Sequence, residues 1–276
     1  MPPRTGATPI YLHENKERPT KIQLTESQEK FSNHNVKTLI QIKKSTIKTI
    51  NFRIEETVTQ YTERAIAIKN LIIAGWTGRD TIAMENHIRE LEALGVKRPA
   101  YTPVFYRVSA ERITTTPSIQ VTGEESSGEA EFVLVRDGGE TYVGIASDHT
   151  DRQVETYGIT VSKQMCEKPC ADTLWRLNDV ADHWDALLLR SYATINGERV
   201  LYQEGKVTAI RSPEDLLAQF ANRGGQFDDG TAMLCGTLAA IGGIRAAQAF
   251  EIVLEDPVLR RTLRHAYSIE TLPVVG

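Results

Sequence analysis

Residues 129–136 read EAEFVLVR, two glutamates directly ahead of an apolar run. The run predicts a buried strand, on which residues i and i+2 point to the same face. The carboxylates of Glu129 and Glu131 then project together, and they repel each other unless a cation neutralises them. Oxygen ligands of this kind suit Mg²⁺ or Mn²⁺. The stretch therefore predicts a metal site at the start of a strand.

A third carboxylate follows on the partner strand. The turn at 137–139, Asp-Gly-Gly, is typical of a hairpin and joins the run to a strand at 141–146. The hairpin returns Asp148 toward Glu129 and Glu131, so that three carboxylates converge. Arg152 follows closely, and either binds a substrate carboxylate in bidentate fashion or pairs with Asp151.

Other interpretations of these residues stay open. E-x-E also fits a solvent-facing strand edge with two surface glutamates, and Glu124 and Glu125 compete for the role of ligand. His149 points away from the carboxylates if the segment stays extended, so we favour a non-catalytic role for it. A plain structural β-domain without metal is one hypothesis for the whole chain.

In order and rough spacing, these residues resemble the fumarylacetoacetate hydrolase superfamily, in which an E-x-E strand is followed by a D-x-T-x-R segment. Further similar segments are a lysine ahead of a Cys-Pro-like turn, an N-G-E…Q hairpin, a P-E-L-I-like helix and a G-T-P-A-G-V-G-like loop. They lie at 161–169, 196–203, 213–217 and 236–242. The stretches 75–80, 123–131 and 147–152 look like an uncharacterised bacterial branch of this superfamily.

The resemblance implies an α+β, β-rich fold, the mixed β-sandwich roll of that superfamily, usually a homodimer. It implies Mg²⁺ or Mn²⁺, with Ca²⁺ as a further option. The implied activity is that of a hydrolase or lyase acting on a small-molecule keto acid, a 2-oxo acid, through a metal-stabilised enolate.

The resemblance also implies roles for single residues. Glu129, Glu131 and Asp148 hold the metal. Lys163 lies near the developing negative charge, with Lys168 as the alternative because the spacing to Asp148 is ambiguous. The substrate-binding residues are Tyr106, Arg152, Gly236 and Thr237.

Two departures from the family pattern bear on the reaction. The segment between Glu131 and Asp148 is shorter than usual, as if a helix were missing. Near the lid, Tyr106 fits, but Ser109 stands where the water-activating histidine would be, and Glu111 is one residue off. Hydrolysis of a C–C bond is therefore in doubt, which leaves dehydration, hydration or isomerisation more open. It also motivates the alternative of a metal-dependent binding or regulatory module without turnover.

Whole-chain properties narrow the function classes. The 276 residues carry a net charge of −4, which gives no argument for nucleic acid. No apolar run approaches the ~20 residues of a membrane span, and residues 1–19 show no apolar secretion signal. Three cysteines fit a reducing compartment, so we expect a cytoplasmic protein.

The pattern divides the chain into an N-terminal arm with strands and a helix at 1–98 and a metal-binding catalytic domain at 99–276. We expect strand structure in the alternating stretch 31–54 and a strand at 65–74, and a helix from a capping box at 77–80 to Leu94 with His87 on its apolar stripe. Asn196-Gly197 predicts a second hairpin and Ser212-Pro213 a helix start. The segment 179–189 fits a helix or a strand.

Overall fold

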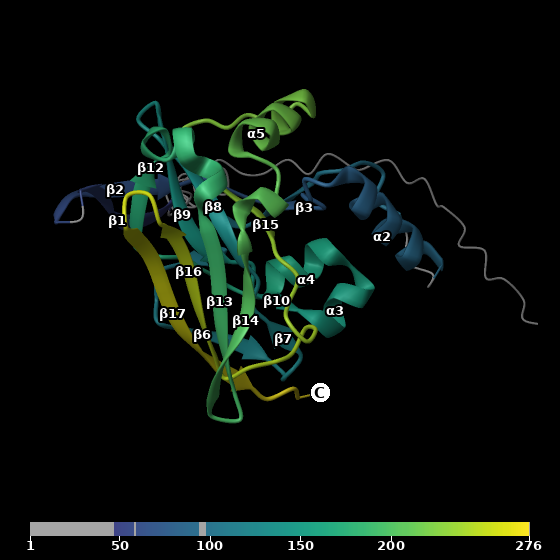
Figure 1. The fold of residues 1–276 in the computed structure, drawn as a ribbon. Helices are drawn as coiled ribbons and strands as arrows, with labels where there is room; N and C mark the ends of the chain where they lie inside the picture. Colours follow the sequence, from purple (N-terminus) through teal and green to yellow (C-terminus); the bar gives the residue numbers. More distant parts are fainter. Residues whose placement is uncertain (1–46, 58, 94–97, 276) are drawn as a thin grey trace, which may run out of the picture. The chain divides into compact units, whose positions relative to one another are not determined.

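The larger of the two main sheets is a mixed sheet of eight strands, which includes β8 and β9 (Figure 1). The computed structural model describes residues 47–57, 59–93 and 98–275. In spatial order the strands of this sheet are β2 (Gln60–Ile68), β1 (Lys48–Thr57), β12 (Thr173–Arg176), β9 (Glu140–Ser147), β8 (Ala130–Asp137), β15 (Thr231–Thr237), β3 (Asn70–Gly75) and β4 (Val104–Val108).

A second sheet of five strands packs against it. Its order is β14 (Glu198–Lys206), β13 (Leu188–Ile195), β16 (Ala249–Asp256), β17 (Arg261–Leu272) and β6 (Ser118–Thr122). Two short pairs complete the strands: β10 (Thr150–Asp151) with β7 (Ser126–Ser127), and β11 (Lys168–Pro169) with β5 (Ile113–Thr114).

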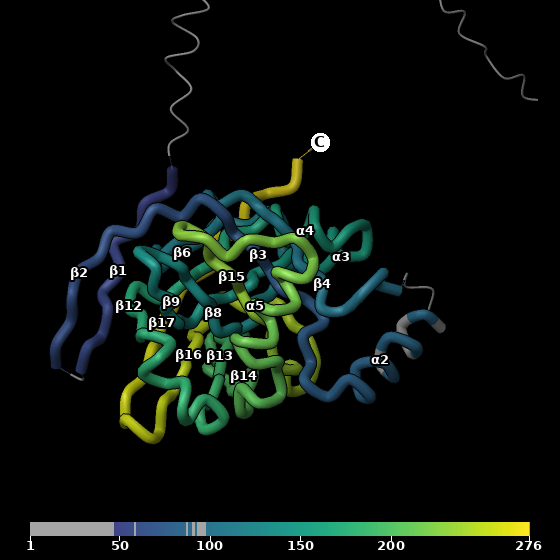
Figure 2. The backbone as a smooth tube through the Cα atoms, turned by 90° about the horizontal axis from the view of Figure 1, so that it is seen from above, coloured from purple at the N-terminus to yellow at the C-terminus, as the bar shows by residue number. Residues whose placement is uncertain are grey.

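The helices are short. They are α2 (Thr81–Ala93), α3 (Arg152–Tyr157), α4 (Ile159–Met165) and α5 (Pro213–Asn222), with 3₁₀ turns η1 (Ala110–Arg112), η2 (Leu177–Asp179), η3 (Ala181–Ala186) and η4 (Val207–Ala209). Seen from above, the β1–β2 hairpin lies at one edge of the large sheet, while α2, α3 and α4 gather on the opposite side (Figure 2).

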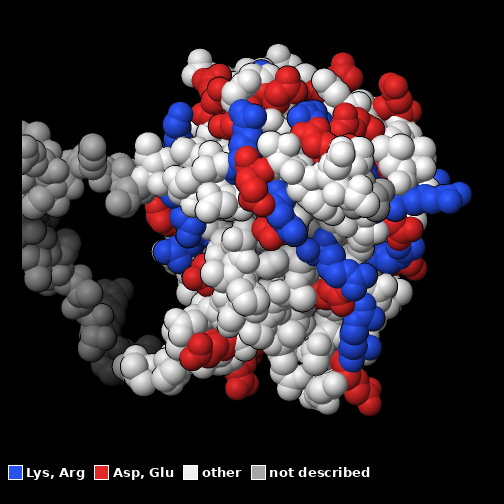
Figure 3. All heavy atoms as spheres, turned by 90° about the vertical axis from the view of Figure 1, so that its left-hand side faces the viewer, with Lys and Arg blue, Asp and Glu red and all other residues white. Residues whose placement is uncertain are grey.

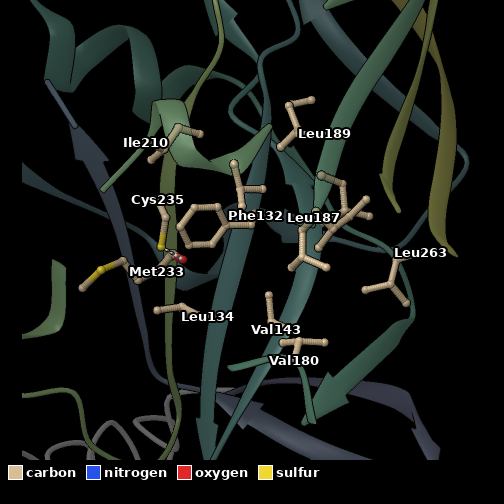
Figure 4. Close-up of a cluster of buried hydrophobic side chains, with 14 of the residues drawn as sticks. Phe132, Leu134, Val143, Val180, Leu187, Leu189, Ile210, Met233, Cys235 and Leu263 are labelled. Carbon is tan, nitrogen blue, oxygen red and sulfur yellow. Dashed lines mark hydrogen bonds between the residues drawn. The ribbon is translucent and has the colours of Figure 1, made fainter. Parts of the chain in front are cut away.

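The apolar run after Glu131 is continuous because both faces of β8 are buried. Phe132 and Leu134 enter the core between the two sheets, where residues of the second sheet such as Leu189 meet them (Figure 4). Val133 and Val135 point the other way, into a second core beneath β1 and β2. Because both faces of β8 are buried, its side chains are apolar on both faces and do not alternate with polar ones. This explains the continuous apolar run in EAEFVLVR.

Both predicted hairpins are confirmed. β8 and β9 pair antiparallel from Asp137↔Glu140 to Ala130↔Ser147, and the turn uses positive φ at Gly138 and Gly139. β13 and β14 meet at Asn196-Gly197, where both residues have positive φ. No helix intervenes between β8 and β9, in accordance with the short segment in the sequence.

Several local predictions need correction. The single strand expected at 65–74 is broken at Lys69, whose N–H donates to the carbonyl of Gly230, into β2 and β3. Helix α2 begins at Thr81 because the Asp80 carboxylate caps Ile82 and Ala83. The segment 179–189, for which the sequence fitted a helix or a strand, contains the end of η2, the turn η3 and the start of β13. The side chain of His87 and the helix end at Leu94 lie outside the described residues.

Strands β1, β2 and β3 belong to the same sheet as β8, β9 and β15. The predicted boundary at residue 98 stays a prediction, and residues 1–46 of the expected arm lie outside the described part. None of the helices within that part is long and apolar enough to cross a bilayer. On the face drawn in Figure 3, acidic and basic side chains are interspersed rather than gathered into one basic surface.

Candidate metal centre and its cavity

Three carboxylates converge where β8 begins and β9 ends. Oxygen atoms of Glu129, Glu131 and Asp148 all lie within 4.8 Å of one another. The backbone closes the group, because the Asp148 N–H donates to the Glu129 carbonyl at 2.9 Å. Neither Glu124 nor Glu125 is part of this cluster, which we call the acidic triad.

Glu131 is the least compensated member of the acidic triad. It is 2% exposed, and no basic side chain in the described residues forms an ion pair with it. Burial, followed by the charges of Asp148 and Glu129, raises its pKa well above the usual range. Its Oε2 accepts a hydrogen bond from the Gly236 N–H at 2.7 Å. A buried carboxylate with one backbone donor is a group that a cation would stabilise.

Asp148 has two lysines as partners. The Lys163 ammonium donates to its Oδ2, and Lys168 Nζ lies 3.1 Å from its Oδ1. Burial raises the pKa of Asp148, but the two ammonium groups outweigh burial and bring it to about 2. Lys168 also donates to the His149 carbonyl at 2.5 Å, so it is fixed behind the acidic triad.

Lys163 reaches Asp148 from helix α4, not from a strand end. Burial disfavours its charge, yet Asp148 and the two glutamates together raise its pKa above the usual range. Its Nζ lies 5.9 Å from the centre of the Tyr106 ring on β4. Neither α4 nor the preceding helix α3 was predicted. Asp151 offered a signal for the start of α3, because its carboxylate caps this helix by accepting the Val154 N–H at 2.8 Å.

Arg152 is engaged by protein carboxylates. Its Nη2 lies 3.1 Å from Glu129 and its Nη1 donates to Glu155 at 2.9 Å. It does not belong to the lining of the adjacent cavity, so its assignment as a substrate ligand stays a prediction. In this structure it holds Glu129 in place.

A bulge in β15 brings Gly236 and Thr237 to the acidic triad. The pairing of β15 with β8 shifts between Leu234 and Thr237, which aims the Gly236 N–H at Glu131. Gly236 has φ +104°, and a Cβ there would lie 1.7 Å from the Thr77 hydroxyl. Only glycine therefore fits this close approach.

Gln203 fixes Thr237, a role that sequence reasoning missed although the residue ends the N-G-E…Q segment. Its side-chain amide donates to the Thr237 hydroxyl at 2.7 Å and to the Leu238 carbonyl at 2.6 Å. Its carbonyl accepts the Ala130 N–H at 3.0 Å, between the two glutamates. Gln203 thus ties β14 to both walls of the site.

A cavity of about 630 Å³ opens beside the acidic triad. Of the predicted site residues, Tyr106, Glu129, Glu131, Lys163, Gly236 and Thr237 line it, while Asp148 and Arg152 lie behind the lining. Lining residues that sequence reasoning missed include Trp76 and Asp80 between β3 and α2, Met84 of α2 and Glu155 of α3. A second hollow of about 670 Å³ around Trp184 and Arg211 contains none of the predicted residues.

His149 and Ser109 lie away from this cavity. His149 is fully buried, with Nδ1 3.1 Å from the Tyr267 hydroxyl and Nε2 2.9 Å from Ser126 Oγ. Burial, followed by the nearby cations, lowers its pKa to about 3, so it is neutral. Ser109 caps η1 and its N–H donates to Gln164. Neither residue is placed to activate a water molecule in the cavity.

A family model described as a protein of unknown function, DUF2848, matches residues 74–267. The chain belongs to the DUF2848 family. The matched range includes the acidic triad, Lys163 and the loop at Gly236. A comparison with curated proteins finds no match.

The fold of this DUF2848 chain is that of fumarylacetoacetate hydrolase-family proteins and related dehydratases. A 2-keto-3-deoxy-D-arabinonate dehydratase in complex with magnesium and 2,5-dioxopentanoate matches with a TM-score of 0.55 and 15% identity, over 79% of each chain. A protein assigned to the fumarylacetoacetate hydrolase family from Yersinia pestis CO92 matches with a TM-score of 0.52 and 15% identity, over 74% of this chain and 94% of the other.

A protein assigned as a fumarylacetoacetate isomerase/hydrolase from Oleispira antarctica matches with a TM-score of 0.53 and 15% identity, over 78% of this chain and all of the other. The predicted resemblance and fold class are therefore confirmed. The acidic triad offers three oxygen donors that fit a hard divalent cation.

Proposed function

We propose that this DUF2848 protein is a divalent-metal-dependent hydrolase or lyase that acts on a 2-oxo acid through the enolate of the substrate. The observation that carries the proposal is the acidic triad, whose oxygen atoms lie within 4.8 Å of one another; Glu129 and Glu131 line the cavity together with Lys163. Mg²⁺ and Mn²⁺ are the proposed ions, since three carboxylates are hard oxygen ligands.

In this proposal Glu129, Glu131 and Asp148 hold the cation, which supplies Lewis-acid stabilisation of negative charge on the substrate oxygens. Lys163 keeps its proton, because its carboxylate neighbours raise its pKa, and it stabilises the charge that develops on the substrate. Gly236 and Thr237 bind the carboxylate at the bulge of β15, and Tyr106 orients the substrate from β4.

Thermal unfolding with EDTA, Mn²⁺, and Mn²⁺ plus oxalate tests the proposal. Oxalate mimics the enolate of a 2-oxo acid, and a ligand that binds only the folded state raises Tm by mass action. We expect Mn²⁺ to raise Tm and oxalate to raise it further only when Mn²⁺ is present. If neither raises Tm, the metal assignment is wrong.

The variant Glu131→Gln sharpens this test. Gln keeps the shape and an acceptor for the Gly236 N–H but removes the charge, so the Tm rise with Mn²⁺ should disappear while the EDTA value stays near that of the wild type. Glu124→Gln, on an exposed carboxylate outside the acidic triad, is the matched control and should respond like the wild type.

The position of Ser109 favours one alternative, a metal-dependent binding or regulatory module. With Ser109 and Glu111 outside the cavity lining, the expected water-activating pair is missing from the site. Tight, Mn²⁺-dependent binding of oxalate without turnover of any 2-oxo acid in a broad panel would favour this alternative over the enzyme.

A further inference from the structure

The cavity changes in chemical character from its floor to its rim. The floor is charged and buried, since Glu131 and Lys163 are both less than one-tenth exposed. Above it, half-buried apolar side chains of Met84, Tyr106 and Leu238 form part of the wall. The rim carries the exposed carboxylate of Asp80.

The charged side chains above the floor are acidic. Asp80 is fixed in place because its Oδ1 caps α2, accepting the N–H groups of Ile82 and Ala83 at 2.9 Å each. Glu155 lines the wall, whereas its partner Arg152 lies behind the lining. Lys163 is the one cation of the lining in the described residues, and it is bound to Asp148 at the floor.

A dicarboxylate would therefore meet opposite conditions at its two ends. One carboxylate would lie at the floor, near Lys163, Gly236 and Thr237. The other would be placed among apolar side chains and toward Asp80, where it would lose water contacts and meet like charge. An apolar tail in the same place would instead gain from burial against Met84 and Leu238.

We infer that the substrate is a 2-oxo acid with a single carboxylate, which lies at the floor, and an uncharged apolar tail that lies against Met84, Tyr106 and Leu238. The inference rests on the proposed function, because the acidic triad must hold the oxo-acid end for the tail to extend toward the rim. Beyond the proposed function, the inference specifies that the tail of the substrate is uncharged and apolar. This distinguishes 2-oxo acids with one carboxylate from those with two.

Two probes of matched shape test the tail. 2-Oxoglutarate carries a terminal carboxylate, and 5-methyl-2-oxohexanoate replaces that group with an isopropyl group of similar outline. Both are titrated calorimetrically into the full-length protein with Mn²⁺, with oxalate as the reference for the floor. We expect 5-methyl-2-oxohexanoate to bind about tenfold or more tightly than 2-oxoglutarate, since each buried carbon of the tail contributes to affinity.

The variant Asp80→Asn isolates the charge at the rim. Asn keeps an oxygen that caps α2, so the helix start is preserved. We expect 2-oxoglutarate to bind about twofold to fivefold more tightly to this variant, the effect of one partly exposed like charge. The affinity for 5-methyl-2-oxohexanoate should not change. Asp182→Asn, on an exposed carboxylate outside the cavity lining, should alter neither value.

The outcomes separate the two proposals. Tight Mn²⁺-dependent oxalate binding together with equal or preferred binding of 2-oxoglutarate would overturn the inference and leave the proposed function standing. An Asp80→Asn variant that binds both oxo acids with unchanged or equally changed affinity would also overturn it. Loss of the Mn²⁺-dependent oxalate signal itself would remove the proposed function and the inference with it.

Discussion

At the scale of single residues, Asp148 connects the acidic triad to two buried ammonium groups. Lys163 contacts it from α4 and Lys168 from β11, and both side chains are almost fully buried. Removing one partner of a buried pair leaves an uncompensated charge, a change that typically costs about 3–5 kcal/mol. A divalent cation and Lys163 both place positive charge beside the same carboxylates.

The variant Lys163→Met should therefore be destabilised in EDTA and rescued in part by Mn²⁺. We expect a loss of about 3 kcal/mol without metal, and a Tm rise on adding Mn²⁺ that exceeds the rise in the wild type. Thermal melts in the two conditions measure both effects. Lys206→Met, at an exposed position, is the control; an equal Mn²⁺ response in Lys163→Met and wild type would contradict the argument.

The burial of His149 predicts that the folded protein loses stability as the pH falls. Its pKa of about 3 in the folded protein lies below the ordinary value of 6.5, so the unfolded chain binds a proton first as the pH falls. Its contribution is therefore complete above about pH 6.5 and is lost toward pH 3, by about 1.4 kcal/mol per pH unit where the difference is one proton.

Urea unfolding between pH 6 and 5 with EDTA measures this loss. The wild type should lose stability more steeply than His149→Gln, with a difference in slope of about 1 kcal/mol per pH unit. Parallel slopes would show that the imidazole is not held neutral.

At the scale of elements, the bulge of β15 sets the geometry of the site. It presents the Gly236 N–H to Glu131 and the Thr237 hydroxyl to the Ala130 carbonyl at 2.8 Å. The variant Gly236→Ala combines a disfavoured φ with a methyl group pressed against Thr77, so we expect a loss of about 3 kcal/mol.

Gly139→Ala separates the two causes, because Gly139 also has positive φ but its Cβ would meet nothing within 4 Å. It should lose only about 1 kcal/mol, the cost of the backbone alone. Urea midpoints compare the two variants. Equal losses would mean that contact with Thr77 adds nothing.

Elements set by local chemistry could be predicted, and elements set by distant partners could not. The β8–β9 hairpin follows from Asp137-Gly138-Gly139, and with it Asp148 arrives beside Glu131. The break at Lys69 depends on Gly230, far away in the chain, and no local pattern marks it. For Arg152 the sequence left open a substrate carboxylate or a pair with Asp151; its carboxylate partners are instead Glu129 and Glu155, and Glu155 lies on helix α3, which was not predicted.

At the scale of the whole molecule, the eight-stranded sheet contains strands from both sides of the predicted boundary at residue 98. β3 lies between β15 and β4 and is paired with each, while Phe52 of β1 and Ile66 of β2 fill the core beneath Val133 and Val135. The cavity depends on the same strand, because Trp76 and Asp80 follow directly after β3. A cut at residue 98 would remove the interior strands β1 and β3, the edge strand β2, seven of the seventeen buried residues of that core and part of the cavity wall.

We therefore expect a fragment of residues 47–276 to unfold cooperatively and to keep the Tm rise with Mn²⁺, whereas residues 99–276 should not. Loss of β3 exposes the backbone edge of β15. Loss of Phe52 and Ile66 alone removes apolar burial that contributes about 2–3 kcal/mol per side chain. The total stability of a typical domain is only about 5–15 kcal/mol. Circular dichroism melts of the two fragments measure the difference. A cooperative, Mn²⁺-responsive melt of residues 99–276 would instead support the predicted boundary at residue 98 and a metal-binding domain that folds by itself.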